Sequence, residues 1–275
     1  MYSVDTIVLT FFIYSVLGWI CEVIYCSVPK KRFVNRGFLY GPYLPIYGFG
    51  ATIVIVVLTR FMEHWYLVFI FGVILTSILE YFTSFLLEKI FSVKLWDYSN
   101  YPLNINGRVC ALNSTLFGLL SLFIMYVVNE PVYHFLTGLN STLLEILSLL
   151  VVAVMSADCA FSVSRMAQFQ KAILELSQAR AEIEERMRIA RESVSSQMLE
   201  KINDRIKADI ENVKASYYGK ARHFFKSNPS LTVRREDLRK PFEFARETYD
   251  SVTQHRHNMR MQRKAEKKGD GNARS

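Results

Sequence analysis

Three acidic side chains stand in or beside long apolar runs of this 275-residue sequence. Glu22, Glu80 and Asp158 each belong to a different run, and Arg108 stands just before a fourth. Charged groups at membrane depth are costly and face a partner or a wet cavity. The three acids could therefore form a polar cluster that binds a cation, a proton or an amine-bearing substrate. Alternatively, each acid lies near one membrane interface and pairs with a loop Lys or Arg.

Residues 35–50 contain four glycines and two prolines, a composition that cannot form a regular helix. Irregular backbone at membrane depth needs protein or a wet cavity to satisfy its amide groups. Broken helices of this kind occur at the substrate sites of transporters. The alternative is a tight loop whose glycines let helices pack closely. The candidate pathway residues in this segment are Arg36, Gly41, Pro42, Pro45 and Gly48.

A second polar stretch, residues 95–108, follows the third apolar run. Trp96 suits the headgroup level of a membrane, while Asp97 and Asn104 are residues that form turns and caps. One interpretation is an interfacial loop. The other is a contact with a polar substrate or a partner, made by Trp96, Asp97, Asn104 and Arg108.

The elements that position these residues are predicted to be membrane-spanning helices, since a span needs about 20 apolar residues to cross roughly 30 Å of hydrocarbon. The second of the five apolar runs is too short unless the Gly-Pro stretch also enters the membrane. The predicted fold class is an all-α integral membrane protein with about five transmembrane helices and a broken or re-entrant Gly-Pro segment, followed by a long cytoplasmic helix and a basic tail. The predicted spans cover residues 4–26, 47–58, 66–87, 112–128 and 143–163.

Basic residues gather in alternate loops between these runs. The first loop holds Lys30, Lys31, Arg32 and Arg36, and the third holds Lys89, Lys94 and Arg108. The second offers only Arg60, and the fourth has no Lys or Arg. Because short cytoplasmic loops are rich in Lys and Arg, we expect a multi-pass protein of the bacterial cytoplasmic membrane with its N-terminus outside and its C-terminus in the cytoplasm.

Three separated motifs resemble those of a known family. They are YSVLGWICE at residues 14–22, FVNRGFLYGP at 33–42 with PIYG at 45–48, and WDYS at 96–99 with NINGR at 104–108. In this order they resemble the bacterial family labelled putative ABC-transporter permease, CmpB-like, over about residues 1–165. The resemblance implies a multi-span inner-membrane permease whose partner is a separate ATPase. The charged extension after residue 165 does not match the family pattern.

The whole net charge of +8 lies in that extension. Residues 1–165 hold 9 basic and 9 acidic side chains, whereas the rest of the chain holds 24 basic and 16 acidic ones. From Phe169 the apolar residues recur at the spacings of three and four that are typical of a coiled-coil seam. We expect a transmembrane domain at 1–165, a long cytoplasmic helix at 166–217 and a basic, partly disordered tail at 218–275. The helix could form a homo-oligomer through residues 169–213 or dock on another part of the same chain.

The tail alone accounts for the excess positive charge of +8, with 15 basic and 7 acidic residues after position 215. Asn228-Pro229 and Lys240-Pro241 are expected to break it into short pieces. The tail could contact the anionic inner leaflet of the lipid bilayer, or it could be a solvated end. Nucleic-acid binding is not expected, because the tail contains no recognised motif.

The sequence lacks the common catalytic motifs. It contains no phosphate-binding loop, no H-E-x-x-H metal site and no G-x-S-x-G nucleophile motif. We therefore expect no catalytic residues, no metal, no cofactor and no enzymatic activity, and any ATPase must be a separate subunit. The four cysteines fall in or beside the predicted spans and are interpreted as small packing residues.

Two hypotheses of function follow. The first is a transport subunit whose substrate or ion passes the Gly-Pro segment and the three acids, with an ATPase bound at loop 89–108. The second is a non-transporting membrane scaffold or sensor that oligomerises through its cytoplasmic helix and contacts anionic lipid or a partner with its tail.

Overall fold

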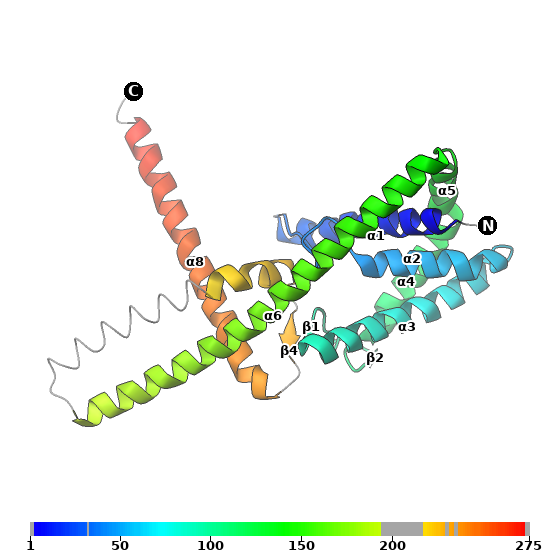
Figure 1. The fold of residues 1–275 in the computed structure, drawn as a ribbon. Coiled ribbons are helices and arrows are strands. Elements are labelled where there is room, and N and C mark those ends of the chain that lie inside the picture. The colour runs from blue at the N-terminus through cyan, green and yellow to red at the C-terminus, as the bar shows by residue number, and fades with distance from the viewer. Residues whose placement is uncertain (1–2, 32, 194–216, 229–230, 234–235, 273–275) are drawn as a thin grey trace. The chain divides into compact units, whose positions relative to one another are not determined.

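The computed structural model describes residues 3–31, 33–193, 217–228, 231–233 and 236–272 (Figure 1). Most of them lie in helices, and in the apolar runs this is expected because backbone groups at membrane depth must be satisfied within the segment. The described helices are α1 (Val4–Lys30), α2 (Pro45–Leu58), the 3-10 helix η1 (Thr59–Phe61), α3 (Trp65–Phe91), α4 (Ala111–Phe123), the π-helix η2 (Ile124–Val128), α5 (Asn129–Thr137), α6 (Ser141–Ser193), helical residues 217–227 and α8 (Glu236–Asn272). The described strands are β1 (Val93–Lys94), β2 (Asn104–Ile105), β3 (Val109–Cys110) and β4 (Thr232–Val233).

The chain forms two compact units. The membrane unit comprises Met1–Ser164 and Lys226–Thr232, and the C-terminal unit comprises Arg165–Phe225 and Val233–Ser275. Helix α6 begins in the first unit and ends in the second. The three-part division expected from the sequence, at residues 165 and 217, stays a prediction.

The all-α membrane class is confirmed. Among the described residues, four helices are long and apolar enough to cross a membrane, and α2 with η1 forms a shorter apolar helix, Pro45–Phe61. The 14 residues of α2, which contains the second of the five predicted spans, cover about 21 Å, less than the roughly 30 Å of a hydrocarbon core. The four long candidates are Val4–Val28, Trp65–Phe91, Ala111–Thr137 and Ser141–Gln178.

The membrane unit is a bundle in which α1 packs along α2 and α3 packs along α4 (Figure 1). Helix α2 also packs against α3 and so joins the two pairs. Its β-branched run is buried on the inner side, with Val54, Ile55 and Leu58 almost inaccessible. The core of the bundle consists of Tyr14, Ala51, Val54, Ile55, Leu58, Val68 and Met125.

The C-terminal unit has an aromatic core of its own. From α6 it receives Phe169, Ile173 and Leu176, which share one face because three- and four-residue spacings bring side chains together on a helix. The ring of Phe169 contacts Phe224 and Phe225, with ring centroids 5.2 and 5.3 Å apart. These apolar positions are thus covered within one chain, and self-association through 169–213 stays a prediction.

Helix α8 closes this core. Phe242 and Tyr249 both contact Phe225, and Tyr249 stacks on Tyr218 with ring centroids 5.3 Å apart. The guanidinium of Arg246 lies 5.0 Å from the centre of the Phe225 ring, a cation–π contact. Burial lowers the pKa of Arg246, although neighbouring Asp250 opposes that shift.

The structure bears on two expectations for the residues after 165. Pro241 was expected to end a helix, but it lies inside α8. Proline removes one backbone hydrogen bond, and we attribute its tolerance to the burial of Phe242 and Ala245 directly after it. The predicted helix at 166–217 is present up to Ser193, and residues 194–216 lie outside the described residues.

Candidate functional site

The Gly-Pro segment returns from the end of α1 to the middle of that helix. From Phe33 to Leu44 the chain is non-helical, and the N–H of Leu44 donates to the carbonyl oxygen of Ser15 at 2.9 Å. Ser15 is completely buried within α1. Helix α2 starts directly afterwards at Pro45, where the fixed φ of proline suits the first helical position. The chain therefore begins α2 alongside the middle of α1, which accounts for the short length of α2.

Asp158 of α6 holds the irregular backbone of this segment. Its two carboxylate oxygens accept hydrogen bonds from the N–H of Tyr40 at 3.2 Å and the N–H of Gly41 at 2.8 Å. The Tyr43 hydroxyl donates to Asp158 at 2.7 Å, and Ser162 donates at 3.2 Å. One carboxylate thus satisfies two backbone amides that no helix satisfies, and the amides stabilise its charge in return.

Close contact between α1 and α2 depends on glycine. A Cβ at Gly48 would lie 2.5 Å from the carbonyl oxygen of Phe11 and 2.2 Å from Oγ of Ser15. A backbone atom cannot rotate away as a side chain can, so only glycine fits here. The segment is thus irregular and its glycine allows tight packing, whereas a role at a substrate site stays a prediction.

Glu22, near the end of α1, forms an ion pair with Arg36. Nη2 and Nε of Arg36 lie 2.9 and 3.2 Å from Oε1 of Glu22. The hydroxyl of Tyr47 donates to Oε2 at 3.0 Å. Next to this pair, Nε1 of Trp19 donates to Oδ1 of Asn35 at 2.8 Å, which fixes the loop against α1. Glu22 is therefore a paired acid with donors on both oxygens.

A short stretch distant in sequence completes the surroundings of Arg36. Residues 226–232 belong to the membrane unit, and Nη1 of Arg36 donates to the carbonyl oxygen of Ser227 at 3.3 Å. Nδ2 of Asn228 donates to the carbonyl oxygen of Gly37 at 3.3 Å. Both Ser227 and Asn228 are buried. Arg36 thus links Glu22 to a segment 191 residues away.

Glu80 of α3 lies deeper, with 5% of its surface exposed. The Tyr98 hydroxyl donates to Oε1 at 3.1 Å. Oε2 is fully enclosed and has no hydrogen-bond partner among the described residues, and the same is true of Oγ of Ser84, four residues further along α3. The Glu22 carboxylate and the Tyr47 hydroxyl are electrostatic neighbours of Glu80.

Tyr98 connects α3 with α4, because it bonds to Glu80 of α3 and to Asn113 of α4. Burial and the charge of Glu80 raise the pKa of the Tyr98 phenol well above its ordinary value, with a smaller contribution from Glu22. A hydrogen bond with Asn113 of α4 opposes the shift. The phenol therefore stays protonated and acts as the donor to Glu80. We call Glu22, Arg36, Tyr47, Glu80 and Tyr98 the polar cluster.

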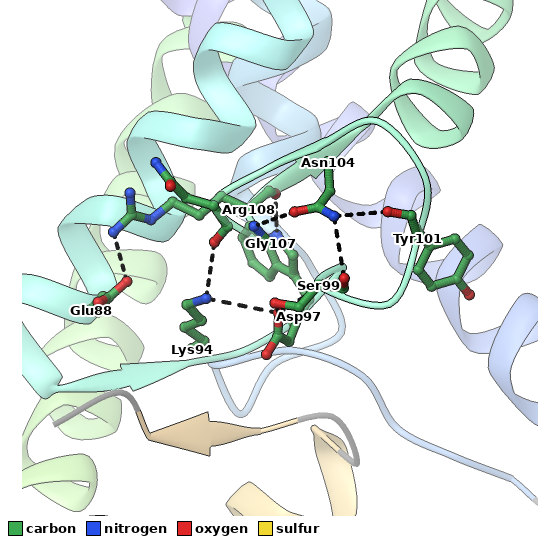
Figure 2. Close-up of polar contacts among 10 residues, drawn as sticks. Glu88, Lys94, Asp97, Ser99, Tyr101, Asn104, Gly107 and Arg108 are labelled. Atoms are coloured by element: carbon green, nitrogen blue, oxygen red, sulfur yellow. Dashed lines mark hydrogen bonds and ion pairs between the residues drawn. The ribbon is translucent and has the colours of Figure 1, made fainter. Parts of the chain in front are cut away.

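The loop that carries Tyr98, residues 92–110, is an ordered hairpin (Figure 2). Strands β2 and β3 pair in antiparallel register, and the turn places Asn106 and Gly107 at φ of +54° and +66°. Asn-Gly with positive φ at both positions is a strong hairpin signal, and the sequence reasoning did not use it. A Cβ at Gly107 would also crowd the side-chain oxygens of Asp97 and Ser99, so a larger residue would have to displace them.

Polar side chains of the loop bond mainly to the loop itself (Figure 2). Oδ1 of Asp97 accepts from the N–H and the hydroxyl of Ser99, at 3.1 and 2.6 Å. Asn104 accepts from the N–H of Gly107 at 3.0 Å and donates to the carbonyl oxygen of Tyr101 at 2.8 Å. Asp97 and Asn104 therefore form turns, as one of the two sequence interpretations holds.

Arg108 fastens the loop to α3. Its guanidinium lies 2.8 Å from Oε2 of Glu88 and lies over the ring of Tyr81, with 5.0 Å between the guanidinium carbon and the ring centre. Burial opposes the positive charge, but the hydrogen bonds and charges of Glu88 and Tyr81 together outweigh it and raise the pKa of Arg108. Nε1 of Trp96 donates to the carbonyl oxygen of Arg108 at 3.0 Å. Trp96 is thus part of the loop scaffold.

The tip of this loop presents apolar side chains to its surroundings. Leu103 is 82% exposed and Ile105 59% exposed, and Tyr101 is also exposed. Leu103 has a φ of +53°, which is unusual for a non-glycine residue. An exposed leucine on a stiff hairpin is a feature of contact surfaces rather than of a core.

The structure brings some of the predicted site residues together and separates others. Glu22 and Arg36 form one pair, and Asp158 with Gly41 forms a different contact. Trp96, Asp97, Asn104 and Arg108 lie in the hairpin, and Pro42, Pro45 and Gly48 shape the irregular segment and the start of α2. The sequence reasoning missed Tyr43, Tyr47 and Tyr98, because a tyrosine near a membrane end reads as an interfacial residue. It also missed Ser227 and Asn228, for which no signal exists in the sequence.

No group of three or more His, Cys, Asp or Glu side chains within the described ranges could hold a metal ion. The cysteines of this part of the chain form no disulfide with one another; they are Cys21, Cys26, Cys110 and Cys159. The chemistry of the cluster is therefore that of carboxylates, phenols and one guanidinium.

Comparison with known proteins identifies the family of this chain. Curated proteins gave no match, and solved structures gave none either. A family model described as Putative ABC-transporter type IV, ABC_trans_CmpB, matches residues 9–163, which is more than half of the chain. That range holds α1 to α5 and the part of α6 that carries Asp158, and it excludes the C-terminal unit. The chain belongs to the ABC_trans_CmpB family of multi-pass membrane proteins.

Proposed function

We propose that this chain is the membrane subunit of a transport system that works with a separate ATPase. The single observation that supports this most strongly is the irregular segment 37–44, which lies against the middle of α1 with its amides held by Asp158. In transporters, interrupted helices of this kind expose backbone groups to substrate at membrane depth. Membership of the family agrees with a role in transport.

The pathway proposed for substrate or ion passes the irregular segment and the polar cluster. Glu22, Arg36 and Tyr47 provide charge and hydrogen-bond donors at the end of α1, and Glu80 lies beside them in α3. With the orientation expected from the loop charges, this end of the bundle faces the cytoplasm. Substrate or ion would therefore meet these groups at the cytoplasmic end of the pathway.

The ATPase contact is proposed at the tip of the hairpin. Leu103 and Ile105 are exposed apolar side chains on a loop that internal hydrogen bonds keep ordered. On the expected cytoplasmic side they are within reach of a soluble subunit. A preordered loop loses little conformational entropy on binding, which favours association.

The test is co-purification of the tagged, full-length chain from its native membranes in mild detergent. We expect ATP hydrolysis in the purified fraction, and we expect Leu103→Ser with Ile105→Ser to abolish it. Met62→Ser is the matched control, since Met62 is a partly exposed apolar residue at the other end of the bundle, between η1 and α3. Its fraction should keep the ATPase.

A deletion strain tests transport itself. We expect its content of ions and small solutes to differ from that of the complemented strain, and we expect complementation with Asp158→Ala to fail. An ATPase-free preparation together with an unchanged solute content in the deletion strain would refute the proposal.

The second candidate is a membrane scaffold or sensor, and the aromatic core of the C-terminal unit favours it. This unit lies outside the range that the family model matches, so it provides something that the shared membrane unit does not. Residues 256–268 contain six basic residues and one acidic residue, which suits contact with anionic lipid.

The experiment places the full-length chain in nanodiscs of zwitterionic or anionic lipid. Slower amide hydrogen exchange in α8 on anionic lipid, lost at high salt, would support this candidate. A dimer in both nanodisc types would support self-association, whereas a monomer with identical exchange on both lipids would refute the scaffold.

A further inference from the structure

Glu80 is the acid of the polar cluster that forms no ion pair within the described part of the chain. Glu22 is paired with Arg36, and Asp158 accepts four hydrogen bonds. By contrast, no ion pair joins Glu80 to a basic side chain of the described residues; Arg108 pairs with Glu88, and Lys94 with Asp97. Among the described residues, its carboxyl group accepts a hydrogen bond from Tyr98 at Oε1 and none at Oε2.

The surroundings of Oε2 require a proton rather than a larger ligand. Oε2 is so enclosed that a water-sized sphere cannot touch it, and it has no partner in the described part of the chain. A metal ion or an amine needs at least that much room. A proton needs none, and it converts an uncompensated carboxylate into a neutral acid that is far less costly to bury.

The groups that face Glu80 leave its second oxygen unpaired. Tyr98 from the hairpin receives a hydrogen bond from Asn113 of α4, and its own hydroxyl donates a hydrogen bond to Oε1. Tyr47 from α2 is engaged with Glu22 of α1, which is itself engaged with Arg36. Ser84, on the same helix, offers an oxygen with no partner among the described residues. The hydroxyls of Tyr98 and Tyr47 thus donate to Oε1 and to Glu22 rather than to Oε2, and the neighbouring Glu22 carboxylate disfavours a second negative charge.

We propose that Glu80 is a proton-binding site of the membrane unit, with the proton held on Oε2 while the Tyr98 hairpin covers it. A rearrangement that admits water or a cation to Oε2 releases the proton. Only the coupling of this release to solute movement rests on the proposed transport function. The bound proton itself can be measured without transport.

The experiment is infrared spectroscopy of the full-length chain in lipid nanodiscs at neutral pH. We expect the carbonyl band of a protonated carboxylic acid, shifted in D₂O, that disappears in Glu80→Gln. Glu130→Gln is the matched control, because Glu130 is largely exposed, and its spectrum should keep the band. Absence of the band from the wild-type chain, or its persistence in Glu80→Gln, would overturn the site.

A second measurement needs no substitution at Glu80. Carbon-13 labelling of the glutamate carboxyl groups should shift the band, whereas labelling of the aspartates should not. A band that follows the aspartate label refutes the proposal even if Glu80→Gln does not fold. A glutamate band in a chain whose deletion leaves solute content unchanged would support the proton site and refute transport.

Discussion

The carboxylate of Asp158 accepts a hydrogen bond from the backbone N–H of Gly41 at 2.8 Å, across 117 residues of sequence. The neighbouring N–H of Tyr40 binds the other oxygen of the same carboxylate. A helix would have satisfied these amides internally, but glycine and proline prevent a helix here. One acid in α6 therefore determines whether segment 37–44 can lie against α1.

We expect Asp158→Ala to destabilise the chain by about 2 kcal/mol, because it leaves the partly buried Gly41 N–H and Tyr43 hydroxyl without this acceptor and a buried donor without an acceptor costs about 1–3 kcal/mol. Asp158→Asn keeps one acceptor oxygen and should lose about half as much. Thermal unfolding in nanodiscs measures the stability, and hydrogen exchange at Tyr40 and Gly41 locates the change. Ser162→Ala, which removes a single 3.2 Å contact, is the control and should lose less than about 1 kcal/mol. Wild-type stability in Asp158→Ala would contradict this role.

Gly48→Ala should destabilise the membrane unit by about 2 kcal/mol, because overpacking a close contact costs roughly 1–3 kcal/mol. The added methyl group would lie 2.5 Å from the backbone oxygen of Phe11. Gly50→Ala is the matched control in the same helix, since its methyl group would meet only Leu79 at 3.5 Å. Alanine is the better helix former by about 1 kcal/mol, so Gly50→Ala should be neutral or slightly stabilising. Equal thermal midpoints for the two variants would show that α1 and α2 are not in close contact at Gly48.

Tyr98 should make stability depend on alkaline pH. Burial and Glu80 raise the pKa of its phenol in the folded chain above the value of about 10 in the unfolded chain. Its stabilising contribution is therefore complete below about pH 10 and is lost as the pH rises beyond that value, because the unfolded chain ionises first. Thermal unfolding between neutral and strongly alkaline pH should show a weaker decline for Tyr98→Phe than for the wild type. The exposed Tyr66 gives the control, and a Tyr66→Phe profile as flat as that of Tyr98→Phe would count against this assignment.

Phe225→Ala should destabilise the C-terminal unit by roughly 3–5 kcal/mol, the usual cost of removing a packed aromatic ring. This ring contacts Phe169, Phe242 and Tyr249 and lies under Arg246. We expect faster hydrogen exchange in residues 217–227 and in α8, with α1 to α4 unchanged. Met259→Ala, at an exposed position of α8, should change neither region. Uniformly faster exchange in both units would show that they do not fold separately.

The sequence predicted the membrane class because hydropathy is a local property and a span must satisfy its own backbone. It also located the irregular segment, since glycine and proline restrict the backbone wherever they stand. The number of helices long enough to span a membrane did not follow from composition alone. Residues 47–58 have the composition of a span, but the start of α2 at Pro45 is set by where Leu44 meets Ser15.

The partners of the acids could not be predicted in the same way. Hydropathy identifies Glu22, Glu80 and Asp158 as unusual, yet it is silent about how each helix is rotated or which loop returns to it. Asp158 meets Gly41, and Arg36 meets Ser227, only because the chain folds back across more than one hundred residues. The sequence by itself determined which side chains are costly to bury. Tertiary structure alone decided that Glu22 and Asp158 are paired while Glu80 keeps an oxygen without a partner among the described residues, because pairing depends on distances between helices that no local pattern encodes.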